Sequence, residues 1–455
     1  MQTHLADWLK GSADGVLAES ILRKCVHCGF CTATCPTYQL LGDELDGPRG
    51  RIYLIKQVLE GKEPTLSTMN HLDRCLTCRN CESTCPSGVE YGHLVDVGRK
   101  IVESKVQRRL PDRLLRIALR EGMTTRWLFE PAMKMAKLLR PLLPEGLRKK
   151  VPKNVRAGAW PKRQHSRKVL LLNGCVQPSM MPSIDAATAR VLDRLGVQAV
   201  VAARSGCCGA VRHHLNDHDG ALVDARRNID AWWPYIDPQA SALSIASPNA
   251  LSSASPRASP SASPNAPSIA SPSVTSSRCE AILINASGCG AMVKDYGHLL
   301  RDDPAYAEKA KRVVELCVDL AQWLPQFTTQ VKSRVMTRRS LDRAGKRVAK
   351  IAFHPPCTLQ HGQQVRGEVE KLLTTLGVHM TAIAESHLCC GSAGTYSVLQ
   401  PELATQLRDQ KLGHLNAGEP DQILSANIGC LTHLQSGSDK PVRHWIEWLD
   451  EAMAD

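Results

Sequence analysis

The chain has 455 residues, of which 43% are hydrophobic, and it carries a formal net charge of +13. This length predicts about two to four domains, and the sequence has no run of about 20 apolar residues that would span a membrane. The positive charge alone is compatible with nucleic acid, anionic lipid or an acidic partner, but no nucleic-acid-binding signature accompanies it. The N-terminus shows neither a basic nor an apolar leader region, so we expect a cytoplasmic protein.

The chain contains eighteen cysteines, and eight of them form two dense runs within the first 105 residues. In a large cytoplasmic protein such cysteines indicate metal ligation or redox chemistry rather than disulfides. The runs are Cys25-x-x-Cys28-x-x-Cys31-x-x-x-Cys35-Pro36 and, 50 residues later, Cys75-x-x-Cys78-x-x-Cys81-x-x-x-Cys85-Pro86. This is the spacing of bacterial ferredoxins with two [4Fe–4S] clusters, in which the fourth cysteine of each run ligates the other cluster.

The spacing therefore predicts two ligand sets. One cluster is expected on Cys25, Cys28, Cys31 and Cys85, and the second on Cys75, Cys78, Cys81 and Cys35. Zinc is the alternative, but zinc sites do not require a third evenly spaced cysteine followed by Cys-Pro.

Helical periodicity surrounds both runs. The segment Arg49–Leu59 has Ile52, Ile55 and Leu59 at helical spacing, and Leu94, Val97 and Ile101 follow the second run in the same way. Residues 1–105 should therefore form a helical ferredoxin domain packed around the two clusters.

Residues 106–167 are rich in Arg, Lys, Leu and Pro, which predicts a basic helical connector. Its stretch Arg113–Lys150 fits two alternatives. It would either lie on anionic lipid as an interfacial helix or pack against the core or a partner subunit.

Residues 168–292 and 348–455 look like two copies of one unit, joined by a helical linker at 293–347 that includes Ala305–Leu324. Three cysteines of the first copy recur in the second at an offset of 182 positions, and a fourth cysteine follows in each copy. The two sets are Cys175, Cys207, Cys208 and Cys289 in the first copy, and Cys357, Cys389, Cys390 and Cys430 in the second. The first copy holds 41 additional residues, which match the Ser/Ala/Pro-rich segment 238–278 and predict a disordered insertion.

Each copy has the pattern of a small α/β unit. The predicted strands are Lys168–Asn173, Gln198–Ala203 and Ala281–Asn285 in the first copy, and Arg347–Phe353, His379–Ile383 and Gln422–Ala426 in the second. Each strand runs into a cysteine within a few residues, and the carboxyl ends of parallel strands share one edge of a sheet. The four cysteines of a copy should therefore converge. The expected fold class is α+α/β, with a helical two-cluster ferredoxin domain followed by two α/β Cys-Cys-Gly units.

This combination resembles a family of iron–sulfur oxidoreductase subunits, which includes those of glycolate oxidase, lactate utilisation, anaerobic glycerol-3-phosphate dehydrogenase and heterodisulfide reductase. It is most similar to the glycolate oxidase type. The segments that carry the resemblance are Cys25-Val-His-Cys-Gly-Phe-Cys, Gly47-Pro-Arg-Gly-Arg-Ile-Tyr, Cys85-Pro-Ser-Gly-Val-Glu-Tyr-Gly and His387-Leu-Cys-Cys-Gly-Ser-Ala-Gly-Thr-Tyr.

The resemblance implies a non-catalytic electron-transfer subunit of a flavin-dependent 2-hydroxy-acid dehydrogenase that converts glycolate to glyoxylate. FAD would sit on partner subunits and electrons would pass towards quinone, with peripheral contact at the inner face of the cytoplasmic membrane. The chain itself shows no Gly-x-Gly-x-x-Gly after a strand and no P-loop. An equivalent subunit for lactate or glycerol-3-phosphate, or a thiol–disulfide enzyme like heterodisulfide reductase, are the alternatives.

The Cys-Cys-Gly units depart from heterodisulfide reductase, in which a further cysteine forms a Cys-x-x-Cys pair with the last one. Met292 and His433 stand at these positions here. The eight cysteines of the units are thus a candidate additional site, for a third cluster, a thiol site or a structural role. Cys279 and Cys317, the latter in an expected apolar helix, are interpreted as bystanders. His27 lies inside the first cluster loop and is expected to tune or cover the cluster without ligating it. The other histidines near the cysteines are interpreted as polar loop residues, with a quinone or proton role as the alternative; they are His213, His214, His354 and His361.

Overall fold

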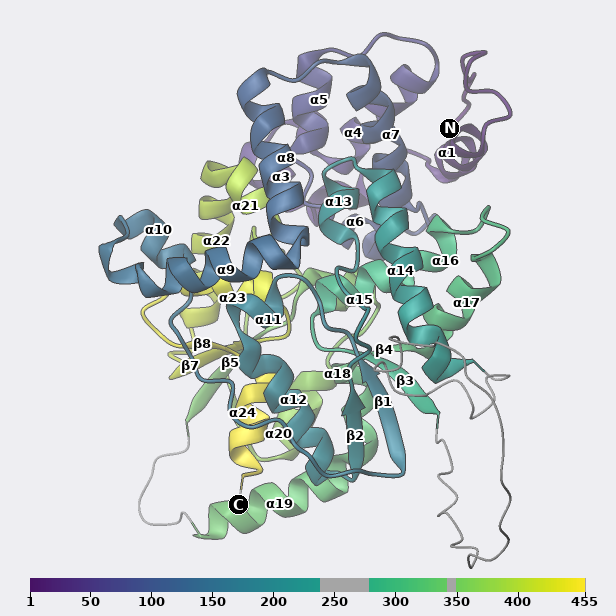
Figure 1. The fold of residues 1–455 in the computed structure, drawn as a ribbon. Helices are drawn as coiled ribbons and strands as arrows, with labels where there is room; N and C mark the ends of the chain where they lie inside the picture. Colours follow the sequence, from purple (N-terminus) through teal and green to yellow (C-terminus); the bar gives the residue numbers. More distant parts are fainter. Residues whose placement is uncertain (238–277, 342–348, 455) are drawn as a thin grey trace, which may run out of the picture.

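The computed structural model describes residues 1–237, 278–341 and 349–454, and consists of a helical N-terminal part and two α/β units (Figure 1). Apart from Arg278, the predicted insertion lies outside the described residues. The N-terminal part contains α1 (Ala13–Lys24), α2 (Phe30–Ala33), α3 (Pro36–Leu41), η1 (Glu44–Asp46), α4 (Pro48–Leu59), α5 (Leu66–Asp73), α6 (Asn80–Thr84) and α7 (Tyr91–Lys105).

The N-terminal helices share one apolar core. The faces predicted from periodicity are buried, with Ile52, Ile55 and Leu59 on α4 and Leu94, Val97 and Ile101 on α7. These two helices approach closely at Gly98, where an added Cβ would lie 2.6 Å from Cγ1 of Ile55. A side chain at Gly98 would therefore push α4 and α7 apart, and α4 carries residues that line both cysteine-rich cavities described below.

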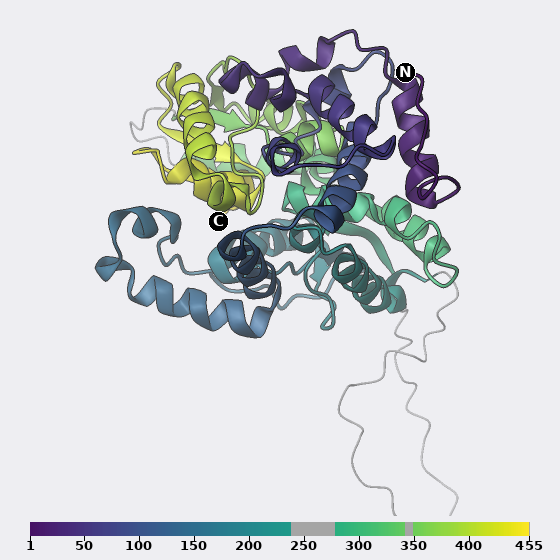
Figure 2. The same ribbon diagram turned by 90° about the horizontal axis from the view of Figure 1, so that it is seen from above.

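The connector forms α8 (Leu110–Thr124), α9 (Arg126–Leu138), η2 (Arg140–Leu142) and α10 (Glu145–Lys150). Helix α8 runs beside the N-terminal helices in Figure 1, and α9 and α10 project beyond the α/β units at one side (Figures 1 and 2). Large apolar side chains on them face solvent, including Trp127, Leu138 and Leu142, which are 78%, 73% and 81% exposed. The connector thus presents an apolar and basic surface rather than a core.

The first α/β unit has a four-stranded parallel sheet with the order β2-β1-β3-β4. Its strands are β1 (Arg167–Leu171), β2 (Val197–Val200), β3 (Cys279–Ile284) and β4 (Cys317–Asp319). Its described helices are α11 (Gln177–Met180), α12 (Pro182–Arg194), α13 (Ala210–His214), α14 (His218–Ile236), α15 (Ser287–Lys294), α16 (Tyr296–Leu299) and α17 (Ala307–Leu316). Parallel pairing with helical crossovers follows from the predicted alternation of strand and helix.

The second unit repeats this topology with the strand order β6-β5-β7-β8. Its strands are β5 (Lys350–His354), β6 (His379–Met380), β7 (Gln422–Ser425) and β8 (Val442–His444). Its helices are α20 (Glu368–Thr375), α21 (Tyr396–Leu399), α22 (Pro401–Asn416), α23 (Ile428–Gln435) and α24 (Trp445–Ala452), with the π-helical η5 (Thr358–Gly362) after β5.

The linker at 293–347 is not wholly helical, which corrects the expectation for this segment. After α17 the chain enters β4, which pairs with β3 and completes the first sheet, before α18 (Leu320–Trp323), η4 (Leu324–Phe327) and α19 (Thr328–Leu341). Cys317 therefore begins an edge strand and does not lie in an apolar helix. The strand has only three residues, too few for a periodic signal.

The two units share one apolar core that contains residues from both sheets. Helix α12 packs against α24 across the boundary, where Arg190 and Arg194 each contact Asp450 at 2.6 Å. The N-terminal helices lie over one end of both units (Figures 1 and 2). This arrangement sets the N-terminal cysteine loops beside the sheet edges at which the other cysteines converge.

Candidate functional site

The first N-terminal cavity is lined by Cys25, Cys28, Cys31 and Cys85, and Cys81 also contributes to its wall. Cys25 and Cys28 lie between α1 and α2, where the chain turns through left-handed His27 (φ 56°) and Gly29 (φ 85°), and Cys31 follows as the second residue of α2. The fourth, Cys85, is brought from the end of α6. Cys28 is exposed, so this cavity lies near the surface.

The second cavity is lined by Cys35, Cys75, Cys78 and Cys81. Its loop repeats the turns of the first, since Thr77 (φ 50°) and Arg79 (φ 57°) stand 50 positions after His27 and Gly29. The structure thus brings Cys35 of the first run to the second cavity and Cys85 of the second run to the first. The two cavities share Pro48, Cys81 and Tyr91, so they are direct neighbours.

Burial disfavours the thiolate form of three of these cysteines. It raises the pKa of Cys31 to about 11, and it raises the pKa of Cys78 and of Cys81 well above the usual range. Metal ligands must be thiolates, so loading these sites releases protons and is favoured by higher pH. A set of four converging thiols, held in a pocket of low polarity, fits an iron–sulfur cluster.

A buried arginine compensates negative charge beside the second cavity. Arg51 is 1% exposed, and its guanidinium donates to the carbonyl of His71 at 2.7 Å and to Oγ1 of Thr37 at 3.1 Å. It also lies 3.4 Å from Asp46. The hydroxyl of Tyr91 donates to Sγ of Cys75 at 3.6 Å. The sequence reasoning did not single out Tyr91, because its role depends on which loops surround it.

The thiols of the first Cys-Cys-Gly unit also converge. Side-chain contacts run from Cys175 to Cys207, from Cys207 to Cys208 and from Cys208 to Cys289. Asn228 of α14 holds the backbone at Cys207. Its side-chain amide donates to the carbonyl of Cys207 at 2.7 Å and accepts from the backbone N–H of Gly206 at 2.8 Å.

The second unit has the same thiol arrangement. Sγ of Cys357 lies 3.7 Å from Sγ of Cys389, and further contacts join Cys389 to Cys390 and Cys390 to Cys430. Cys357 and Cys389 pack in one apolar cluster with Leu76 and Cys78 of the second N-terminal cavity. The structure thus brings the second unit's thiols directly beside the N-terminal ones.

His354 was interpreted from the sequence as a polar loop residue, and the structure corrects this. It ends strand β5 and is 1% exposed, with its ring nitrogens beside Cys390 and Cys430. His361 also differs from a solvated histidine, since it contacts Ser83 of α6 and the carbonyl of His387, both at 3.0 Å. Cys279 and Cys317 are buried in the same apolar cluster as Cys208, but neither of them interacts electrostatically with another thiol of the described residues.

A separate cavity of about 150 Å³ lies between the N-terminal helices and the first unit. His93, Asp96, His213, Asp295 and His298 contribute to its wall. Burial opposes the charged form of His213, but the Asp96 carboxylate 3.1 Å away outweighs this effect and raises the pKa of His213. Burial lowers the pKa of His298 to about 4. The contact between Asp96 of α7 and His213 of α13 thus connects the N-terminal helices to the first unit.

Among the described residues, no helix combines the length and the apolar character that crossing a membrane requires.

Comparison with known proteins supports this organisation. Residues 21–89 match the 4Fe-4S dicluster domain, and residues 169–249 and 351–435 each match the Cysteine-rich domain. The chain is 51% identical over 454 residues to the glycolate oxidase iron–sulfur subunit of Escherichia coli, covering 100% of this chain and 99% of that one.

More distant relatives agree with this match. A probable glycolate oxidase iron–sulfur subunit of Bacillus subtilis is 28% identical over 93% of this chain and 90% of its own length. Lactate utilization protein A of an Exiguobacterium is 23% identical over 63% of this chain and 98% of its own. The chain therefore belongs to the family of glycolate oxidase iron–sulfur subunits, with an iron–sulfur electron-transfer role in an oxidoreductase.

Proposed function

We propose that the chain is the electron-relay subunit of a flavin-dependent glycolate dehydrogenase. It would carry single electrons from FAD on partner subunits towards quinone. The observation that supports this most directly is the pair of adjacent cavities, which together are lined by all eight N-terminal cysteines, with Cys81 in both. We propose these two sets as the ligands of two [4Fe–4S] clusters, which would supply one-electron acceptance and donation.

The division of labour follows from the chemistry. Oxidation of glycolate to glyoxylate removes two electrons and two protons, usually as a hydride and a hydroxyl proton. A site built from thiol-ligated iron accepts one electron at a time and no hydride. The chain therefore needs a flavoprotein partner to separate the electron pair.

The residues of this chain hold and tune the relay. Arg49 lines the first cavity and Arg51 the second. Fixed positive charge beside a cluster favours the extra electron of the reduced state. Cys81 lines both cavities, so the distance between the two sites is set by one short helix, α6.

A thiol–disulfide enzyme is the second candidate function, and one observation disfavours it. His433, which stands where heterodisulfide reductase has a cysteine, supplies no thiol, and its Nε2 lies 3.0 Å from the carbonyl of Ala404. Lactate or glycerol-3-phosphate remains the alternative substrate, because the substrate does not contact the relay subunit.

We also propose that the connector makes peripheral contact with the inner face of the cytoplasmic membrane. Exposed Trp127, Leu138 and Leu142 stand among basic side chains on α9 and η2, a combination that binds anionic interfaces. The chain should float with anionic vesicles, and a Trp127→Ala/Leu142→Ala variant should float less. Equal flotation of both proteins would contradict this contact.

The relay proposal predicts that the purified subunit does not oxidise glycolate by itself. Mixing the iron-loaded chain with glycolate and ferricyanide, a one-electron acceptor, should give no turnover until the flavoprotein partner is added. Flavin-free chain that turns over glycolate would contradict the proposal and would move the active site to the Cys-Cys-Gly units.

A further inference from the structure

A buried histidine in the second α/β unit has no hydrogen-bond partner among the described residues. His354 is 1% exposed, and both of its ring nitrogens lack a partner. A buried polar group without a partner is costly, so native proteins rarely keep one unless a ligand completes it. The missing partner of this ring is therefore expected to be a bound ligand and not a protein group.

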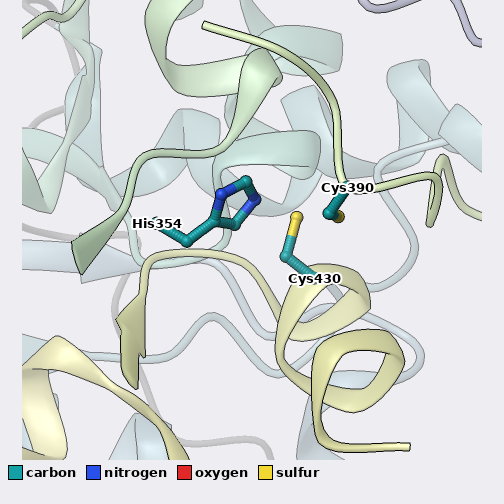
Figure 3. Close-up of side chains that lie close together, drawn as sticks. All are labelled: His354, Cys390 and Cys430. Atoms are coloured by element: carbon teal, nitrogen blue, oxygen red, sulfur yellow. The ribbon is translucent and has the colours of Figure 1, made fainter. Parts of the chain in front are cut away.

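The ring faces thiols (Figure 3). A ring nitrogen of His354 and the Sγ atoms of Cys390 and Cys430 all lie within 4.8 Å of one another. These residues come from the end of β5, the loop before α21 and the start of α23. Contacts with Cys357 and Cys389 extend the group to five soft donors.

Five donors exceed the four ligands of a tetrahedral metal ion. Two cysteines that are adjacent in the sequence, as Cys389 and Cys390 are, also rarely ligate the same ion. The donor set therefore favours a centre with several metal atoms. Thiolate with imidazole is also the ligand combination of iron–sulfur centres in which histidine replaces cysteine.

A buried cation supports an anionic centre at this position. Lys411 is 2% exposed, and its ammonium donates to the carbonyl of Glu385 at 2.6 Å. It interacts electrostatically with Cys390, Cys389 and Cys357. A buried ammonium needs a negative partner, and a thiolate-ligated centre would provide one.

The first unit lacks both features. The position equivalent to His354 is Leu172, three residues before Cys175 as His354 is three before Cys357. Gly209 packs on Ala221 as Gly391 packs on Ala404, so these two alanines are equivalent. Asn228 and Lys411 each stand seven residues after that alanine, which makes Asn228 the counterpart of Lys411. Asn228 is neutral, and it donates to the carbonyl of Cys207 and accepts from the backbone N–H of Gly206. The first unit therefore has no buried cation at this position that would need a negative partner.

The second unit's thiols are also the ones next to the N-terminal sites. Cys78 interacts electrostatically with Cys357 and Cys389. The amide of Asn80 on α6 donates to the carbonyl of His387 at 3.3 Å, two residues before Cys389. A centre in the second unit would therefore adjoin the second cavity.

We propose that the second Cys-Cys-Gly unit holds a third iron–sulfur centre with His354 as a nitrogen ligand beside Cys357, Cys389, Cys390 and Cys430. This inference rests on the proposed relay. The centre exchanges one electron with the cluster proposed on Cys35, Cys75, Cys78 and Cys81, so one is oxidised as the other is reduced. Because imidazole is neutral and thiolate is not, histidine ligation raises the reduction potential of the centre above that of an all-thiolate centre.

The test uses the full chain, loaded anaerobically with iron and sulfide and titrated with reductant while electron paramagnetic resonance is recorded. The wild-type chain should bind more iron than the roughly eight atoms of two [4Fe–4S] clusters and should show a third signal. His354→Leu should lose or shift that signal and leave the other two unchanged. His354→Cys should restore a centre with a lower potential.

Controls separate ligation from folding. Leu172→Met, at the equivalent position of the first unit, should keep all three signals, and Cys430→Ala should lose only the third. A wild-type chain with about eight iron atoms and with identical titrations for His354→Leu would overturn the inference, as would zinc in the second unit. Missing N-terminal signals beside a persistent third signal would reject the proposed relay and support this centre.

Discussion

Replacing Cys75 by alanine is expected to remove about four iron atoms from the loaded chain and to abolish electron transfer in the assembled complex. Cys75 is buried in the second cavity beside the hydroxyl of Tyr91. A cubane that loses one of four thiolates is left with an open iron, and the remaining path is interrupted because the second cavity lies between the first cavity and the second α/β unit. Iron analysis and dye reduction by the complex measure the two effects.

A matched control is available in the same chain. Cys317→Ala removes an equally buried cysteine that lies in the first sheet's core, so it should leave iron content unchanged. The exchange of ligands between the runs can be tested as well. Cys35→Ala should disturb the same resonance signal as Cys75→Ala, whereas Cys31→Ala should disturb the other. If Cys35→Ala instead disturbed the signal that Cys31→Ala disturbs, each run would hold its own cluster.

Replacing Arg51 by leucine is expected to destabilise the N-terminal part by on the order of 3–5 kcal/mol, the usual cost of breaking a buried charge pair. The substitution leaves Asp46, the carbonyl of His71 and the hydroxyl of Thr37 without their shared donor. Asp46 is itself fully buried, so water does not replace the lost contact. Loss of cluster absorbance with increasing denaturant reports this region separately from the α/β units.

Arg74 provides the comparison for this prediction. It contacts the same carboxylate at 2.8 Å, but its side chain is 36% exposed. Arg74→Leu should therefore cost only about 1 kcal/mol or less, as exposed pairs do. Equal losses for the two variants would show that burial does not set the strength of this network.

The sequence predicted the parts of the structure that depend on local spacing. Cysteines two residues apart must share a loop, and the faces of α4 and α7 follow from residues one turn apart. Gly196 and Gly377 stand just past the ends of α12 and α20 and adopt left-handed backbones (φ 76° and 73°), the conformation that glycine commonly takes after a helix. Three strands of each sheet were predicted for the same reason, to within a few residues at their ends.

The convergence of the cysteines was predicted as well, but other features that depend on contacts between distant segments were not. Strands β4 and β8 have three residues each, and they are strands because β3 and β7 offer them an edge. His354 precedes two prolines and was therefore interpreted as a loop residue, whereas its burial depends on segments that are distant in the sequence, including those that carry Cys390 and Cys430. The comparison of Leu172 with His354 across the duplication was the one sequence signal that could have marked it.

The most direct test of the relay is to follow the iron of this chain during turnover. The complete complex is mixed with glycolate and frozen at successive times for electron paramagnetic resonance. The account predicts that the signals of the N-terminal sites become reduced within one turnover, before any acceptor is reduced, and that Cys75→Ala removes this step. Acceptor reduction at the full rate while these sites stay oxidised would contradict it.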